Sequence, residues 1–188
     1  DVHVVGDRFA HAYEAMQLRA AQTGALIVHP YDQPEVIEGQ GTLAREFEVQ
    51  GADLDTILVA VGGGGLIGGI AAWFGGAPTQ RVRVVGVEPA ACPSLHAALA
   101  AKHPTDVAVG GVAVDSLGAT QVGSLMFPIA QAHVERVVLV SDDAIRAAQR
   151  LAWDGLRVAL EPGGATALAA LASGAYVPAL GERVGVVL

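Results

Sequence analysis

The stretch from Thr56 to Leu66, TILVAVGGGGL, decides how the sequence is interpreted. Residues 55–61 form a short apolar run, which is typical of a strand buried on both faces of a sheet. Four consecutive glycines at 62–65 are costly in backbone entropy, so their presence needs a reason. An apolar segment that reaches about Phe74 follows and is expected to be a helix. A glycine loop at a helix N-terminus presents backbone N–H groups to an anion, and the sequence therefore predicts a phosphate site here.

Other interpretations of the glycine loop differ in strength. A P-loop is excluded, because no Lys followed by Ser or Thr comes after the glycines. The dinucleotide fingerprint G-x-G-x-x-G fits any glycine tract, but Glu88 ends the next expected strand, where a ribose could bind. The nucleotide interpretation therefore stays open. So does a tight turn that serves packing alone, although two glycines would normally suffice for one.

The remaining chain alternates between strand-like and helix-like segments. Apolar runs predict strands at residues 2–5, 25–28, 55–61, 82–87, 136–140 and 184–188. Helices are expected at about 8–23, 42–50, 66–74, 94–101 and 163–173, with another that begins at Ser141. Residues 104–118 have little periodicity and are expected to form a loop. This alternation predicts an α/β fold with a mainly parallel sheet.

Local signals support several of these boundaries. One face of the first expected helix carries Phe9, Tyr13, Met16 and Ala20. Gly24 is suited to end that helix. Pro30 and Pro34 disfavour regular structure around them, and we expect the chain to cross between two domains there. Gly41 or Thr42 can start the second helix, and the Ser141 hydroxyl can cap the helix that follows it.

Composition limits the possible functions. The chain has 188 residues, enough for one domain and part of a second, and 52% of them are apolar. Its formal net charge of −8 argues against nucleic acid and against an anionic membrane surface as partners. Cys92 is the only cysteine, which excludes an intrachain disulfide and fits a reducing cytoplasm. No apolar run reaches the length of a membrane span.

The two ends of the sequence predict a fragment of a longer protein. The chain has no initiating Met, opens in the strand-like run at residues 2–5 and closes in another at 184–188. Its first residues include no basic region of the kind that begins a signal peptide.

Several segments together resemble the fold-type II pyridoxal-phosphate enzymes, specifically the threonine and serine dehydratases and serine racemases. The resemblance runs from Val2 to Leu188 and rests on ordered segments. They are His29-Pro30-Tyr31-Asp32-Gln33, Gly39-Gln40-Gly41-Thr42, Gly62 to Leu66, Glu88-Pro89, Gly111 to Gly118, and Glu161-Pro162-Gly163-Gly164-Ala165. Six such segments in this order are specific to the family, though not to one substrate.

The resemblance implies an incomplete three-layer fold of the tryptophan synthase β-like type. Residues 1–32 would be the end of a small domain and 33–188 most of a large domain that binds pyridoxal 5′-phosphate. The implied phosphate-binding residues are Gly62, Gly63, Gly64, Gly65 and the N–H of Leu66. Glu161 would lie near the cofactor ring, or would only interact with a helix dipole. Gly111 would lie near the ring face, or would serve packing alone.

Glu88 matches a position that binds a cation in some members of this family. The usual companion carboxylate, six residues further on, is replaced by Ser94. A hard cation prefers several oxygen ligands, so one carboxylate is a weak site. The alternative is that Glu88 is simply a polar residue at the end of a strand.

Residues that the family needs for catalysis are missing from this sequence. The Schiff-base lysine lies in a Ser-x-Lys segment upstream of the phosphate loop in the family, whereas Lys102 is the only lysine here and matches no family motif. We expect Lys102 to be a surface residue and assign no catalytic residue to this chain. The chain also contains no Asn, although relatives use an asparagine loop to bind the substrate carboxylate. The Ser or Cys that follows the last strand in relatives is absent too.

The reaction that the resemblance implies is β-elimination from L-threonine or L-serine, which yields a 2-oxo acid and ammonia. The isolated chain is expected to be inactive, and the parent enzyme is expected to be a homodimer. Two alternatives stay open. One is a serine racemase or another β-eliminating enzyme with the same cofactor, and the other is a non-catalytic remnant that binds a phosphate ligand or a partner chain.

Overall fold

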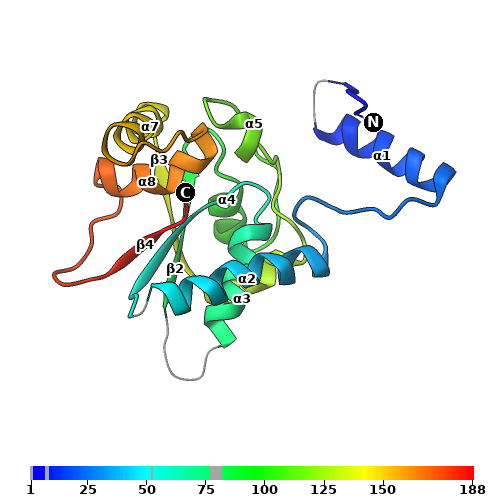
Figure 1. The fold of residues 1–188 in the computed structure, drawn as a ribbon. Coiled ribbons are helices and arrows are strands. Elements are labelled where there is room, and N and C mark those ends of the chain that lie inside the picture. Colours follow the sequence, from blue (N-terminus) through cyan, green and yellow to red (C-terminus); the bar gives the residue numbers. More distant parts are fainter. Residues whose placement is uncertain (1, 7–8, 52, 77–81) are drawn as a thin grey trace.

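The structure is a computed structural model that describes residues 2–6, 9–51, 53–76 and 82–188. Within those residues, four parallel strands form one sheet with the order β3-β2-β1-β4 (Figure 1). The strands are β1 (Thr56–Ala60), β2 (Arg83–Pro89), β3 (Val134–Val140) and β4 (Val184–Val186). The predicted α/β fold with a parallel sheet is therefore confirmed.

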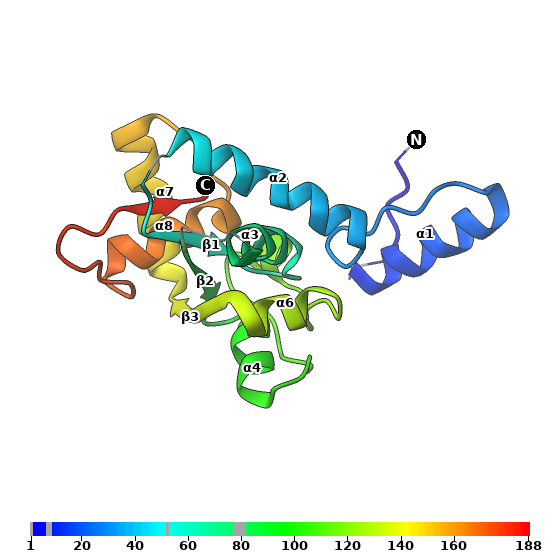
Figure 2. The ribbon, with the colours of Figure 1, turned by 90° about the horizontal axis from the view of Figure 1, so that it is seen from below.

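Helices cover both faces of this sheet, so the fold has three layers (Figure 1 and Figure 2). On one face lie α2 (Pro34–Gln50), α3 (Gly65–Gly76), α4 (Ser94–Ala101) and α6 (Met126–His133). On the other face lie α5 (Val114–Leu117), α7 (Asp142–Leu156) and α8 (Pro162–Ser173). No helix among the described residues is both long enough and apolar enough to cross a bilayer.

The strand β1 lies in the middle because its side chains are apolar on both sides. Ile57 and Val59 belong to the core under α2 and α3, whereas Leu58 belongs to the core under α7 and α8. All three are completely buried. Because successive side chains of a strand point to opposite faces, this run fills two cores at once.

The helix α1 (Phe9–Thr23) is set apart from the body of the molecule in both views (Figure 1 and Figure 2). Tyr13, Met16 and Ala20 are its half-buried positions on the predicted face. The side chain of Phe9, which shares that face, and the whole of Arg8 lie outside the described residues. Gly24 ends the helix with a φ of +70°, and its N–H donates to Ala20 O, as predicted.

The strands predicted at residues 2–5 and 25–28 are wrong. Both segments are irregular, and Val2, Val4 and Leu26 are almost fully exposed. A strand needs a neighbouring strand to accept and donate its backbone hydrogen bonds. The described residues provide no such neighbour for either run, so local propensity alone does not make a strand.

The helix α2 begins at Pro34, eight residues before the predicted start at Thr42. Proline is favoured in the first turn of a helix, and Glu35 in that turn interacts favourably with the helix dipole. Gly41 therefore lies inside the helix. A Cβ on Gly41 would lie 3.2 Å from the carbonyl oxygen of Gly69 in α3, so small residues let the two helices approach closely.

The other predicted elements are confirmed within a few residues. The helix α4 has the predicted bounds, and Ser141 caps α7 by accepting a hydrogen bond from the N–H of Ala144. The helix α6 was not predicted, and α5 interrupts the expected loop at 104–118. Both are short elements whose residues are held by long-range contacts.

The strand order reverses beside β1. From β1 the chain moves to β2 and β3 on one side, and it then returns through α7 and α8 to place β4 on the other side. In open parallel sheets, ligands bind outside the carboxyl ends of the strands at such a reversal. The glycine loop that follows β1 lies at this position.

Candidate functional site

The carbonyl groups of Gly62, Gly63 and Gly64 are held by hydrogen bonds from the surrounding protein. Gly62 O accepts from Ser94 Oγ at 3.0 Å, and Gly63 O accepts from the N–H of Gly123 at 2.9 Å. Gly64 O accepts from the N–H of Gly68 at 2.8 Å, which is the first turn of α3. In a trans peptide, a carbonyl and the N–H of the next residue point in opposite directions. The N–H groups of Gly63, Gly64 and Gly65 therefore point away from these anchors.

These N–H groups are available to bind an anion. In the described part of the chain, no protein acceptor is bonded to the N–H of Gly63, Gly64, Gly65 or Leu66. Gly65 and Leu66 are the first two residues of α3, where the helix dipole adds partial positive charge. This arrangement of successive N–H groups is an anion nest, so the loop fits a phosphate group that is bound through backbone alone.

Packing also constrains the glycines of this loop. Gly64 has a φ of +91°, which L side chains rarely adopt. A Cβ on Gly63 would come closer than 3.0 Å to the ring of Tyr31, and one on Gly65 closer than 3.0 Å to the Tyr31 backbone. A Cβ on Gly62 would lie 3.0 Å from Leu117 Cα.

The segment His29 to Gln33, before α2, supports the loop from one side. Nδ1 of His29 accepts the N–H groups of Tyr31 and Asp32 at 3.1 and 2.8 Å. The Asp32 carboxylate accepts the N–H groups of Ser124 and Leu125, both at 2.9 Å. Sequence reasoning did not predict these contacts, because residues 32 and 124 are far apart in the chain.

Residues from three parts of the chain meet at the Gly62 end of the loop. Leu117 in α5 contacts Gly62, and the neighbouring Ser116 lies so close to Gly163 that a Cβ there would clash with its hydroxyl. Glu161 is the residue that precedes α8, and its carboxylate caps no N–H of that helix. The structure therefore brings Ser116, Leu117 and the start of α8 to the loop. The role of Glu161 toward a cofactor stays a prediction.

Gly111 is explained by its own backbone and packing. It has a φ of +79°, and an added Cβ would meet the Asp142 carboxylate and Ala91. Asp142 also accepts the N–H of Val112 at 3.1 Å. These contacts are with the start of α7 and the turn after β2 rather than with the glycine loop. The predicted place of Gly111 near a cofactor ring stays a prediction.

Glu88 at the end of β2 is fully buried and receives hydrogen bonds on both carboxylate oxygens. Oε1 accepts from the N–H of Leu95 at 2.7 Å and lies 3.1 Å from Ser94 Oγ, and Oε2 accepts from the N–H of His96 at 2.8 Å. Burial raises the pKa of Glu88 to about 7, although these donors favour the ionised form. The described residues contain no cluster of three or more His, Cys, Asp or Glu that could hold a metal. The predicted cation at Glu88 stays a prediction.

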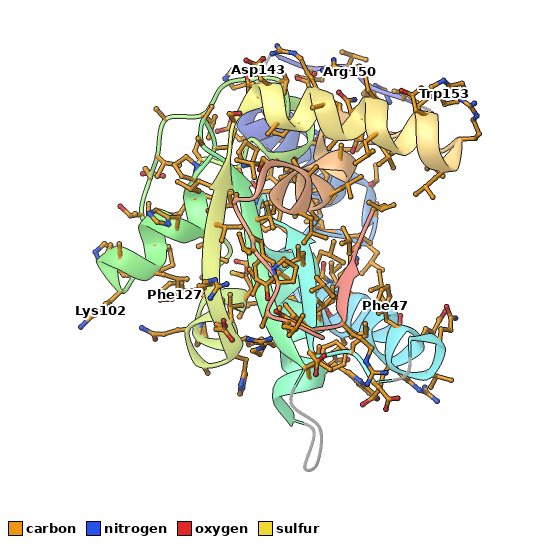
Figure 3. All side chains as sticks on the ribbon, turned by 90° about the vertical axis from the view of Figure 1, so that its left-hand side faces the viewer. Phe47, Lys102, Phe127, Asp143, Arg150 and Trp153 are labelled. Carbon is orange, nitrogen blue, oxygen red and sulfur yellow. The ribbon has the colours of Figure 1, made fainter. Side chains whose placement is uncertain are left out.

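Lys102 lies at the end of α4 opposite to Ser94, the residue that contacts the glycine loop. It ends α4 in a left-handed backbone conformation and is exposed. Figure 3 shows its side chain pointing outward from the tip of that helix. The expectation that Lys102 is a surface residue is confirmed.

An anion nest at the first turn of α3, beside the reversal of a parallel sheet, fits the class of α/β proteins that bind a phosphorylated ligand. The chain belongs to the family of pyridoxal-phosphate dependent enzymes, whose model matches residues 1–188. Pyridoxal phosphate, rather than a dinucleotide, is the cofactor of this family, and the relatives that match the chain include threonine ammonia-lyases and threonine dehydratases.

Individual relatives agree with this family assignment. The chain is 34% identical to phenylserine dehydratase of Ralstonia pickettii, covering 98% of this chain and 56% of that one. It is 38% identical to L-threonine ammonia-lyase of Geobacter sulfurreducens, covering 91% of this chain and 42% of that one. The structure matches maize serine racemase with a TM-score of 0.90 at 29% identity, over 99% of this chain and 57% of the racemase. The chain thus spans about half the length of these proteins, and the predicted fold-type II architecture is confirmed.

Proposed function

We propose that the protein to which these residues belong is a pyridoxal-phosphate-dependent ammonia-lyase for a β-hydroxy amino acid, L-threonine or L-serine. The proposed reaction is β-elimination that yields a 2-oxo acid and ammonia. The observation that carries the proposal is the set of N–H groups of Gly63, Gly64 and Gly65, which the anchored carbonyls orient for a phosphate. Family membership and the ammonia-lyases among the relatives support it.

In this proposal, the residues of this chain bind and orient the cofactor. The loop N–H groups, with that of Leu66, would hold the phosphate, and Gly62 would set the turn. Glu161 and Gly111 would lie near the cofactor ring. When bound, pyridoxal phosphate supplies an electron sink for the charge that develops as the substrate loses its α proton. Fixing the phosphate holds the ring in one orientation while protons move.

The lysine that carries the cofactor in this reaction has no counterpart among the residues of this chain, since Lys102 is exposed at the end of α4. We propose that the lysine lies in a part of the protein outside these 188 residues, and that the 188-residue chain alone is inactive. We also propose that residues 1–32 belong to a small domain and 33–188 to the large one. The separation of α1 from the sheet supports this boundary (Figure 1).

Two other substrates or outcomes have specific support. The similarity to phenylserine dehydratase favours an aromatic β-hydroxy amino acid as a second candidate substrate. The match to maize serine racemase favours a racemase as a second candidate reaction.

The test is an assay of the whole protein with pyridoxal phosphate and each of L-threonine, L-serine and threo-phenylserine, with ammonia and D-serine as readouts. We expect ammonia from threonine or serine, and none from the 188-residue chain under the same conditions. Ammonia from phenylserine alone would assign the aromatic substrate instead. D-serine without ammonia would assign a racemase. Ammonia from the 188-residue chain would contradict the proposal that it lacks the catalytic lysine.

A further inference from the structure

Ser94 connects a buried acid to the phosphate loop. Its side chain is completely buried, and its Oγ lies 3.0 Å from Gly62 O and 3.1 Å from Glu88 Oε1. Gly62, 32 residues before Ser94, follows β1, and Glu88, 6 residues before Ser94, lies near the end of β2. Ser94 therefore joins the ends of two neighbouring strands.

The contact of Ser94 with Gly62 controls the direction of one peptide group. Because Gly62 O points toward Ser94, the N–H of Gly63 in the same peptide points away from it. That N–H is the first donor of the anion nest. Four consecutive glycines impose few steric limits on this peptide, so without the hydrogen bond it can rotate.

Glu88 in turn holds Ser94. The carboxyl group of Glu88 is itself held by the N–H groups of Leu95 and His96, which belong to the same helix start as Ser94. A hydroxyl has one proton and can donate to one oxygen at a time. Ser94 Oγ lies within hydrogen-bonding distance of both Gly62 O and Glu88 Oε1, so the buried carboxyl group keeps the hydroxyl beside the loop carbonyl.

We propose that Ser94 is a positioning residue for the cofactor: through its hydrogen bond to Gly62 O it orients the N–H of Gly63 toward the phosphate. This inference rests on the proposed function of the loop. It assigns Ser94 a role that does not require a cation, although Ser94 stands where some relatives have a second carboxylate ligand.

The test compares three variants of the 15N-labelled 188-residue chain, titrated with pyridoxal 5′-phosphate and separately with inorganic phosphate. Ser94→Ala removes the hydroxyl, and Ser94→Cys keeps the shape of the side chain but weakens the donor. Ser141→Ala is the matched control, because Ser141, like Ser94, lies at the start of a helix at this edge of the sheet but has no bond to the loop. The amide signals of Gly63, Gly64 and Gly65 report binding, and thermal unfolding reports stability.

We expect Ser94→Ala to weaken binding of both probes by about three- to tenfold, which is the effect of losing one hydrogen bond. The Gly63 amide should lose most of its ligand-induced shift, and Ser94→Cys should lie between wild type and Ser94→Ala. Ser141→Ala should lose stability but bind both probes as wild type does. Wild-type affinity in both Ser94 variants would overturn the inference and leave the proposed function intact. Absence of binding in the wild-type chain would instead contradict the proposed function.

Discussion

Gly64 is the glycine of the phosphate loop whose backbone has a positive φ. Its φ is +91°, and an added Cβ would come closer than 3.0 Å to the side chain of Met126. We predict that Gly64→Ala destabilises the chain by about 1–2 kcal/mol through backbone strain and weakens binding of pyridoxal phosphate at least about tenfold. The binding loss follows because strain relief rotates the peptides that present the N–H groups. Chemical denaturation and calorimetry measure the two effects.

Gly174 is the matched control for this substitution. It also has a positive φ, +77°, but an added Cβ meets nothing within 4 Å. Gly174→Ala should therefore lose a similar amount of stability and bind the cofactor normally. Equal binding by Gly64→Ala and Gly174→Ala would show that the loop conformation does not determine affinity.

The sequence predicted the glycine loop as a phosphate site because four adjacent glycines are a strong local signal. It did not predict the groups that orient the loop. Ser94, Gly123 and Tyr31 are 30 or more residues from the glycines that they contact, so no local pattern predicts these contacts. Ser94 was recognised only as the position of a missing carboxylate.

At the scale of elements, α2 and α3 approach each other through glycines. An added Cβ on Gly69 would come closer than 3.0 Å to the backbone of Ile37 and Gly41, which cannot move aside as a side chain can. We predict that Gly69→Ala separates the helices and lowers the free energy of unfolding by about 2 kcal/mol or more, as other overpacked cores do. Urea denaturation measures this change.

Gly39, also inside α2, is the control. An added Cβ there meets nothing within 4 Å. Gly39→Ala should stabilise the chain by about 0.5–1 kcal/mol, because Ala has the higher helix propensity. If both substitutions stabilise the chain, the close crossing of α2 and α3 is wrong.

Sequence reasoning misplaced two strands and one helix start, each for its own reason. Apolar runs at residues 2–5 and 25–28 have strand propensity but no neighbouring strand among the described residues. The start of α2 was predicted too late because Pro34 was expected to disfavour regular structure, whereas it lies in the first turn of the helix. By contrast, β1, α4 and α7 were predicted well, because their burial pattern and caps are encoded locally.

At the scale of the whole molecule, the edge of the sheet opposite the phosphate loop has its own polar centre. Glu182 Oε1 accepts hydrogen bonds from Thr56 Oγ1 and Arg83 Nη2, both at 2.6 Å, and from the Tyr176 hydroxyl. Oε2 accepts the N–H of Ala179 at 2.6 Å. These bonds join β1, β2 and the segment before β4, so Glu182 holds the short edge strand in place.

Glu182 gives the fold a predictable dependence on acid. Burial alone would raise its pKa, but the hydrogen bonds and Arg83 lower it to about 2, from 4.5 in an unfolded chain. Its stabilisation is therefore present above pH 4.5 and is lost as pH falls toward 2. We predict that Glu182→Gln lowers the free energy of unfolding by about 2–3 kcal/mol at pH 7 and that the difference from wild type shrinks between pH 5 and pH 2.

Denaturant titrations of both proteins across this pH range measure the difference. Glu182→Gln should bind pyridoxal phosphate as wild type does when both are folded, because Glu182 lies at the other edge of the sheet. A difference that stays constant with pH would contradict the assigned role of its charge.

The central claim is that the backbone of the glycine loop recognises the phosphate of the cofactor. The most direct test is calorimetric titration of the 188-residue chain with pyridoxal 5′-phosphate and, in parallel, with pyridoxal, which lacks only the phosphate. The account predicts saturable binding of pyridoxal 5′-phosphate at one site and at least about tenfold weaker binding of pyridoxal, since charge-assisted hydrogen bonds are lost. Equal binding of the two compounds, or no binding of either, would contradict it.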